Sequence, residues 1–287
     1  MDKLYHWLTH GIPLGNLIRM TAWYDRFIMA HQTPSLHASL SPTAQATRLG
    51  ENYWRLEIPA SATRGYRLSQ LDDHTGLKRR EFLWKPPLSL NLQARLSAAD
   101  LPGTWGFGFW NDPFSFLIAY GGSLGRFPTL PQAAWFFHAS PQNYLSFRDD
   151  LPANGFLAAT FRSQNIPAAM LAVAAPALGF TLFPRTARLM RGLIRRVVSQ
   201  DSSSIKIDPT QWHEYALNWE DGQIIFSVDE MQIFQTTVIP QPPLCLVIWI
   251  DNQYAALPPM GRLKYGTQPN PEPAWMEVRD IAIYYAG

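Results

Sequence analysis

Hydrophobic and polar residues alternate with a period of two over residues 211–237. The alternation falls into three runs, 213–219, 223–228 and 232–238, which are separated by short acidic segments where a chain can reverse. A period of two places successive side chains on opposite faces of a strand. The pattern therefore predicts a three-stranded antiparallel meander.

The same alternation recurs upstream, and we expect further strands at 53–58, 66–71, 81–84 and 88–96. Segment 105–110 is different, because glycines alternate with aromatic residues there. One predicted face carries three aromatic rings, and the other carries Gly106, Gly108 and Trp110. Strand glycines often mark a place where another group approaches the backbone closely. We expect the first face to join a core and the second to offer a ligand platform.

Residues 1–48 are predicted to form a helical extension and a linker. Apolar residues recur at helical spacing over 1–32, with a break near Gly11 and Pro13. This helix either packs on the outside of the strands or docks on a membrane or a partner. Segment 33–50 is polar and rich in Ser, Thr, Ala and Pro, and it is predicted to be the linker.

Residues 164–207 interrupt the strand pattern. Segment 166–184 carries no charge, but Pro167, Pro176 and Pro184 divide it, so two short apolar helices are favoured over a membrane span. Segment 185–198 predicts a basic amphipathic helix, whose arginines lie mostly opposite an apolar stripe of Leu189, Met190, Leu193, Ile194, Val197 and Val198. Such a helix either lies in a membrane interface or presents a solvated arginine face. The whole insertion predicts an apolar lid.

Several segments resemble motifs of the concanavalin A-like lectin/glucanase superfamily, especially of family 16 glycoside hydrolases. Residues 212–229 match the family's Trp-His-x-Tyr-x-x-x-Trp strand, its turn and its Val-Asp strand end through Trp212, His213, Tyr215, Trp219, Val228 and Asp229. Residues 93–96 and 103–110 are similar to the family's EARAK … GTWPAFW strand pair. Segments 243–252 and 275–285 fit its closing strands.

This resemblance covers about 52–287, with the one interruption. It implies an all-β fold, a two-sheet antiparallel β-sandwich of the concanavalin A-like jelly-roll type, over residues 49–287. The helical insertion 164–207 lies within that domain.

The catalytic motif of those hydrolases, Glu-x-Asp-x-x-Glu or a close variant, is not found in this sequence. Retaining glycosidases need two carboxyl groups about 5 Å apart, on one face of a strand. The corresponding segment here, 132–140, contains no carboxylate. The acidic doublets elsewhere, such as Asp72-Asp73, are predicted to be turns, since adjacent strand residues point to opposite faces. The family's catalytic residues therefore do not carry over, and hydrolysis of that type is not expected.

Other residues on the expected concave face suggest ligand binding. If Ala134, Phe136 and His138 share that face, His138 would stand where the family keeps its acid-base groups and would be able to shuttle protons. The alternative is a hydrogen-bonded core histidine. Near a strand end, Trp249, Asp251 and Asn252 offer ring stacking and charge-assisted hydrogen bonds to a sugar, or they simply enter a turn. The predicted ligand-binding residues are Trp105, Trp110, Trp135, Phe136, His138, Trp249, Asp251 and Asn252.

Composition narrows these possibilities. Charged residues make up 16% of the chain, against about 25% in typical domains, whereas aromatic residues make up 13% and include 11 Trp. Either an apolar surface is exposed to a ligand, partner or membrane, or the core is rich in Trp. A net charge of +2 gives no reason to expect nucleic acid. Neither a metal nor a cofactor is predicted, since the histidines are scattered.

Two features bear on location. The single cysteine, Cys245, lies in an apolar strand and forms no internal disulfide. The first residues lack a continuous apolar stretch of the kind found in signal peptides. We therefore expect a cytoplasmic protein, with membrane contact through 185–198 as an open possibility.

Three functions are compatible with this sequence. The first is a protein without glucanase activity that binds a glycan, a glycolipid or an apolar small molecule on an aromatic concave face under an apolar lid. The alternative is an enzyme on the same scaffold, in which His138 and Asp251 act on an apolar or glycosidic substrate. The third is a module that docks on a membrane or partner through 1–32 and 185–198.

Overall fold

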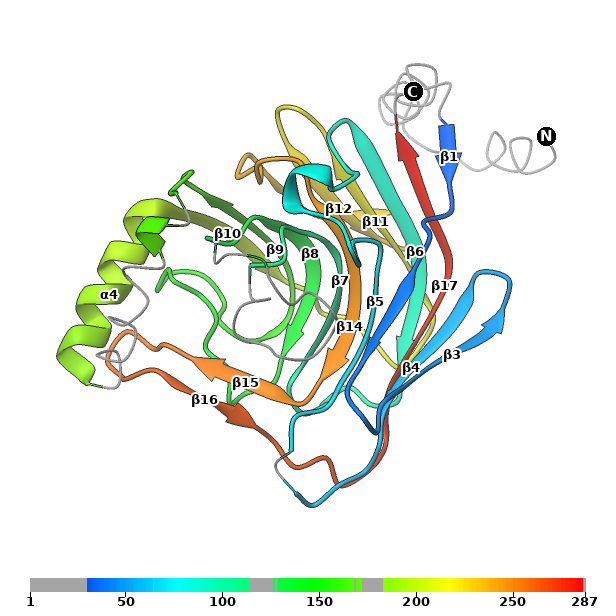
Figure 1. Cartoon of the computed structure of the whole chain (residues 1–287), viewed down its shortest axis with the longest axis horizontal. Coiled ribbons are helices and arrows are strands. Elements are labelled where there is room, and N and C mark those ends of the chain that lie inside the picture. Colours follow the sequence, from blue (N-terminus) through cyan, green and yellow to red (C-terminus); the bar gives the residue numbers. More distant parts are fainter. Residues whose placement is uncertain are drawn as a thin grey trace.

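Two antiparallel sheets face each other and enclose a hydrophobic core (Figure 1). The computed structural model describes residues 30–63, 65–113, 126, 129–167, 169–171 and 183–285. The predicted all-β sandwich is confirmed. Outside the sheets there are a short hairpin, β15 (Gln253–Ala256) with β16 (Lys264–Thr267), a turn of 3₁₀ helix, η1 (Arg79–Glu81), and the helix α4 (Pro184–Val197).

The first sheet, sheet A, is built around the predicted meander. Three strands consecutive in the sequence pair antiparallel at one edge, and β6 joins them to the rest of the sheet. The strands in spatial order are β13 (Met231–Thr236), β12 (Ile224–Val228), β11 (His213–Trp219), β6 (Leu88–Leu96), β17 (Ala274–Tyr285), β4 (Tyr53–Ile58) and β3 (Gln45–Gly50), with β1 (Ala30–Gln32) pairing with β17.

The second sheet, sheet B, curves as an arc in Figure 1, and its inner side is called the concave face below. The strands in spatial order are β10 (Val198–Ser204), β9 (Gly155–Ser163), β8 (Ala133–Ala139), β7 (Thr104–Trp110), β14 (Cys245–Asp251), β5 (Leu68–Asp72) and β2 (His37–Leu40). All neighbouring strands in the arc are antiparallel.

Aromatic rings from both sheets interlock in the core. Phe107 of β7 lies with its ring centroid 5.0 Å from that of Tyr215 in β11, and Phe109 lies 6.0 Å from Trp219. All four side chains are buried. Burying a large apolar side chain contributes about 1.5–3 kcal/mol, so this row anchors β7 against sheet A. The core role predicted for the aromatic row of 105–110 is confirmed.

Four predicted boundaries differ from the structure. The helix predicted over 1–32 does not extend to its expected end, because residues 30–32 form strand β1, paired with β17. Segment 33–50, predicted to be a linker, contains the edge strands β2 and β3. Their residues are mostly exposed, so no apolar alternation marks them in the sequence. Segment 81–84 is not a strand: its first residue ends η1, and Trp84 forms a single bridge to Leu244. The insertion 164–207 ends sooner than predicted, because residues 198–204 form strand β10 of sheet B.

Other predictions fall outside the described residues. These are residues 1–29 of the helix predicted over 1–32 and most of the apolar segment 166–184. The predicted basic helix is confirmed as α4, within one residue at each end. Within the described residues, no helix combines the length and the hydropathy needed to cross a bilayer.

Candidate functional site

The concave face of sheet B carries a second hydrophobic cluster, separate from the core between the sheets. We call its rings the aromatic cluster: Trp110, Trp135, Phe137, Phe161 and Trp249. Trp249 is central, because its ring centroid lies 5.3 Å from that of Trp135 and 5.9 Å from that of Phe137. Trp110 stacks nearly parallel to it at 6.5 Å, with 7° between the planes. Strands β7, β8, β9 and β14 thus combine their rings on one surface.

Two glycines of β7 make room for this cluster. A Cβ atom at Gly106 would lie 2.8 Å from Cη2 of Trp249 and 2.4 Å from the Phe136 carbonyl oxygen. A Cβ atom at Gly108 would lie 2.7 Å from Cβ of Trp135, and the backbone φ of 149° there also favours glycine. The glycine-lined second face of β7 lies where the sequence analysis put it, and it lies under two tryptophans.

The aromatic cluster is covered rather than open. Trp135 and Trp249 are each 8% exposed. Partly buried apolar residues of the described chain pack against the cluster, among them Leu145, Phe147, Ile194 and Val197, the last two from α4. Within this apolar setting the indole Nε1 of Trp135 is buried and has no hydrogen-bond partner among the described residues. A buried N–H without an acceptor is costly, so this donor is available to a ligand oxygen.

A polar group closes one end of the aromatic cluster. The indole Nε1 of Trp249 donates to Oγ1 of Thr104 at 3.0 Å, and that hydroxyl donates to Oδ1 of Asp251, also at 3.0 Å. The same carboxylate oxygen accepts the backbone N–H of Gln253. Burial raises the pKa of the Asp251 carboxyl to about 7. Trp249 and Asp251 thus lie on the same face of β14 and are joined through the Thr104 hydroxyl.

Asn252 is fully engaged by the backbone. Its Oδ1 accepts the N–H of Arg67 at 2.8 Å, and its Nδ2 donates to the carbonyl oxygens of Gly65 and Gln268. The residue is completely buried. Asn252 therefore joins three chain segments. Because it is buried and its amide group is bonded to the backbone, the structure does not favour its predicted contact with a ligand.

The other end of the concave face is a buried polar cluster. His74 lies with Nδ1 3.2 Å from Oδ1 of Asp72 and Nε2 3.7 Å from Oδ2 of Asp112, and Arg126 pairs with Asp112. Its ring contacts Trp110 edge-on at 6.4 Å, which joins this end to the aromatic cluster. Burial is the main cause that lowers the pKa of His74, to about 4. The ring is therefore neutral at physiological pH.

Asp72 has a structural role at the end of β5. Its two oxygens accept hydrogen bonds from the backbone of His74 and Thr75 and from the side chains of Ser39, Gln70 and Thr75. Such saturation caps the strand end and leaves the carboxylate no free lone pair for a substrate.

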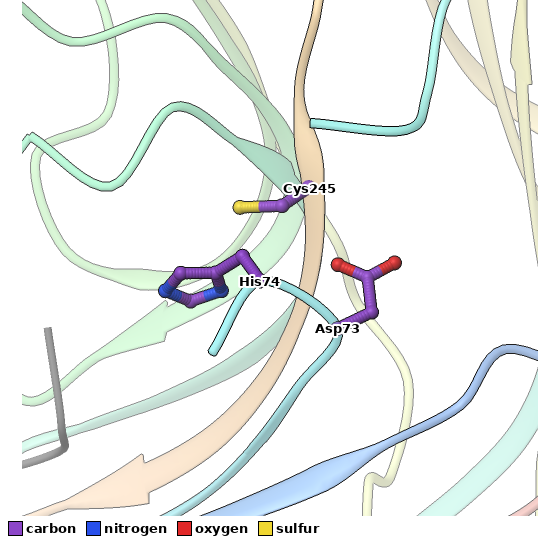
Figure 2. A group of neighbouring side chains, drawn as sticks. All are labelled: Asp73, His74 and Cys245. Carbon is purple, nitrogen blue, oxygen red and sulfur yellow. The ribbon is translucent and has the colours of Figure 1, made fainter. Parts of the chain in front are cut away.

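Asp73, His74 and Cys245 bring potential metal ligands within 4.8 Å of one another (Figure 2). Figure 2 shows the His74 ring and the Cys245 thiol on one side of β14 and the Asp73 carboxylate on the other. That carboxylate already accepts the Trp84 indole N–H and the Leu246 backbone N–H.

The Cys245 and Asp73 groups are better suited to keeping their protons than to binding a metal ion. The Cys245 thiol donates to the Trp110 carbonyl, and burial raises the pKa of that thiol. Burial also raises the pKa of Asp73, to about 7. A metal ion needs a thiolate and a free carboxylate oxygen, so we interpret the group as a proton-bearing, structural network.

The structure places three predicted ligand-binding residues away from the concave face. Phe136 and Trp105 belong to the core between the sheets. His138 also points to that side, where it stacks on Trp105 at 5.2 Å with 9° between the ring planes. The predicted concave position of Phe136 and His138 is wrong. Every residue of β8 is buried, and in such a strand no polar position marks which face is which.

Burial lowers the pKa of His138 to about 4, so its ring is neutral between the sheets. His138 and Asp251 lie on opposite faces of sheet B and do not come together. Conversely, the His74 cluster is not predicted from the sequence, because the doublet Asp72-Asp73 is typical of a turn. Asp73 and His74 directly follow β5, and Asn111 and Asp112 directly follow β7. Both strands pair antiparallel with β14, so these residues meet at one edge of sheet B.

No protein-family model matches the chain, and no curated protein matches it either. Among solved structures, LamAcat from Zobellia galactanivorans is similar over 89% of this chain and 94% of its own, with a TM-score of 0.43 and 12% identity. A family 16 endo-glucanase from Bacteroides ovatus is similar over 85% of both chains, with a TM-score of 0.42 and 10% identity. A legume lectin-like domain from Entamoeba histolytica covers 88% of this chain and 89% of its own, with a TM-score of 0.39 and 12% identity.

The second of these structures is a glucanase and the third is a lectin-like domain. Two other similar structures are longer: this chain spans 43% of HCR/D-Sa-GBL1/C and 17% of a sialidase. At such identities and TM-scores the likeness assigns no role to any residue. The strand order and the site described above rest on this chain's own contacts.

Proposed function

We propose that the concave face of sheet B binds a carbohydrate, with sugar rings stacked on the aromatic cluster. One observation carries the proposal: a second buried cluster, centred on Trp135 and Trp249, lies on the face of sheet B that points away from sheet A. The core between the sheets already supplies the burial that holds a sandwich together. A further aromatic surface on the opposite side is therefore suited to a ligand.

The chemistry of the cluster supports a sugar. The C–H face of a pyranose packs on an indole ring, and its hydroxyl oxygens need donors and acceptors at the rim. Trp135 Nε1 is a donor without a partner among the described residues. Thr104 and Asp251, bonded to Trp249 through one hydroxyl, supply polar atoms at the rim.

The cover over the cluster is part of the proposal. The rings are buried as the structure stands, so a ligand reaches them when the packed residues Phe147, Ile194 and Val197 move away. Two of these belong to α4, which would then act as the lid that the sequence analysis predicted. Loops and short helices that open over a binding site are a common arrangement.

Catalysis by His138 with Asp251 is not supported, because sheet B separates them. Among the described residues, no carboxylate occupies a concave position of β7, β8 or β9. These positions hold Thr104, Gly106, Gly108, Trp110, Ala133, Trp135, Phe137, Ala139, Gly155, Leu157, Ala159, Phe161 and Ser163. We therefore propose binding rather than catalysis. The indole donor of Trp135 and the polar atoms of Thr104 and Asp251 favour a carbohydrate over an apolar small molecule.

The test compares tryptophan variants on an oligosaccharide array. Trp135→Ala combined with Trp249→Ala should lower the affinity for any bound oligosaccharide at least tenfold, because stacking on each ring contributes about 1 kcal/mol or more. Trp275→Ala is the matched control: this ring lies on the outer face of sheet A, where it holds Arg55 at 4.3 Å. Circular dichroism establishes that each variant is folded. Unchanged affinity in a folded double variant contradicts the proposal, as does binding of apolar probes but no sugar.

A further inference from the structure

The helix α4 exposes apolar side chains on the face turned away from the sandwich. Leu189 is 65% exposed and Leu193 is 45% exposed, and Phe183, which directly precedes the helix, is 64% exposed. The inner face carries Ala187 and Arg191, which are buried, and the half-buried Ile194 and Val197. The helix is thus apolar toward both sides, which packing against the sandwich alone does not require.

The same outward face is strongly basic. No acidic residue occurs in α4, which carries five arginines. Arg191 points inward and pairs with Asp149, to which Arg195 also reaches. Arg185, Arg188 and Arg196 are exposed, and no ion pair involves them among the described residues. These three arginines, together with Phe183, Leu189 and Leu193, make up what we call the outward face of α4.

We propose that the outward face of α4 docks this protein on the surface of an anionic lipid bilayer. Arginines attract acidic headgroups, and apolar side chains beside them enter the headgroup–acyl boundary. A helix of 14 residues is about 21 Å long, which suits lying in the membrane plane and is too short for crossing it. In Figure 1 α4 lies at the edge of the molecule, beyond β10, where a flat surface can reach it.

The combination of arginines with exposed apolar side chains on this face favours a membrane over other anionic partners. A nucleic acid would use the arginines through its phosphates and would gain little from leucines lying between them. A bilayer uses both, and its binding weakens when either set is removed. The observations behind this proposal are separate from those behind the carbohydrate site, because they concern the opposite face of the helix.

A fluorophore at position 192 reports docking directly. Gly192 lies between Leu189 and Leu193, and a Cβ atom there meets nothing within 4 Å. Gly192→Cys can be labelled selectively with an environment-sensitive dye, because the only other thiol, Cys245, is buried. Gly222→Cys is the matched control, since it also has open space and lies in the turn between β11 and β12.

With vesicles of phosphatidylglycerol mixed into phosphatidylcholine, which carry a negative surface potential, the emission of the dye at position 192 should shift to the blue. The dye at position 222 should not. Pure phosphatidylcholine vesicles should give a much smaller shift, and raising the salt concentration should reverse the anionic binding. A shift that is equal at both positions, or absent at position 192, overturns the proposal.

Two sets of substitutions in the full chain then separate the membrane from a soluble polyanion. Replacing Arg185, Arg188 and Arg196 by Gln should lower the vesicle partition coefficient about a hundredfold, since each basic residue contributes roughly fivefold near an anionic surface. Leu189→Asn with Leu193→Asn should lower it at least tenfold. The charge-matched control replaces the exposed Arg80, Lys85 and Lys206 by Gln.

The control set should bind vesicles as the unmodified chain does. If the leucine pair has no effect, or if single-stranded RNA binds to the arginines while anionic vesicles do not, the membrane proposal is wrong. If the control set loses as much binding as the arginine set, the attraction comes from net charge, and α4 has no special role.

Discussion

At the scale of single residues, Gly106 and Gly108 shape the concave face. Both allow tryptophans of neighbouring strands to lie directly against the backbone of β7, at distances that no Cβ atom tolerates. Asp251 then ties Trp249 to the strand end through Thr104. Small and buried polar residues, rather than the aromatic rings themselves, therefore decide where the rings lie.

Substituting these glycines tests that statement. Gly108→Ala should lower the free energy of unfolding by about 2–3 kcal/mol, because the new Cβ meets the Ala134 carbonyl oxygen at 2.4 Å and neither backbone can move freely. Gly192→Ala, in open space on α4, should instead raise it by about 0.5–1 kcal/mol through helix propensity. Urea denaturation followed by circular dichroism measures both, and equal effects of the two variants would show that the strand is not closely packed there.

The Asp251 carboxyl predicts a specific pH dependence of stability. Its pKa is raised from 3.8 to about 7 by burial, so the folded state holds a proton that the unfolded state releases between these values. The stabilising contribution is therefore complete below about pH 4 and is lost as the pH rises to about 7. Its upper limit is about 4 kcal/mol.

Asp251→Asn isolates this term, since its amide oxygen can still accept the three donors around Oδ1. The difference in unfolding free energy between the unmodified chain and this variant should change steadily from pH 4 to pH 7 and then level off. Asp73 also titrates near 7, but its contribution cancels in the difference. A difference that is flat over this range would mean that Asp251 is ionised throughout.

At the scale of elements, α4 is the segment whose two faces have different tasks. Its inner face holds Arg191, whose guanidinium donates to the carbonyl oxygens of Ser146 and Leu257 and pairs with Asp149. An arginine is buried while Leu189 and Leu193 are exposed. This is the reverse of what a hydrophobic stripe predicts for a surface helix.

The strands could be predicted from the sequence because alternation is a local property, and β6 and β11 were placed to the residue. Two orientations could not be predicted from the sequence. One is which residues of β8 point to the concave face, since every residue of that strand is buried, and the other is that Arg191 points into the sandwich. The partners of Arg191 lie 45 and 66 residues away along the chain. Such orientation depends on tertiary contacts that no local pattern contains.

Arg191→Met should release α4 from the sandwich. The substitution removes a buried charge and leaves two carbonyl groups without donors, which costs about 2–4 kcal/mol. Hydrogen exchange of the α4 amides should accelerate, whereas exchange in β7 and β14 should not change. The control is Arg188→Met, an exposed arginine of the same helix. If both variants exchange alike, Arg191 does not hold the helix.

In the molecule as a whole, three regions have separate chemistry. The core between the sheets supplies stability, the concave face carries the aromatic cluster, and α4 lies between that cluster and the outside. Ile194 and Val197 connect the last two, because they belong to α4 and pack against the cluster. The helix therefore relates access to the concave face to contacts on its own outer side.

This arrangement predicts how the cover affects ligand binding. If an oligosaccharide binds only when α4 has moved away, its apparent affinity is reduced by the fraction of molecules that are open. Arg191→Met raises that fraction, so it should increase the association rate and tighten the apparent affinity about tenfold or more. Arg188→Met should leave both unchanged. Stopped-flow fluorescence measures the rates, and the variant's unfolding curve establishes that it is folded. Weaker binding in a folded Arg191→Met variant would mean that the covered form is the one that holds the sugar, with α4 contributing to the site itself rather than closing it.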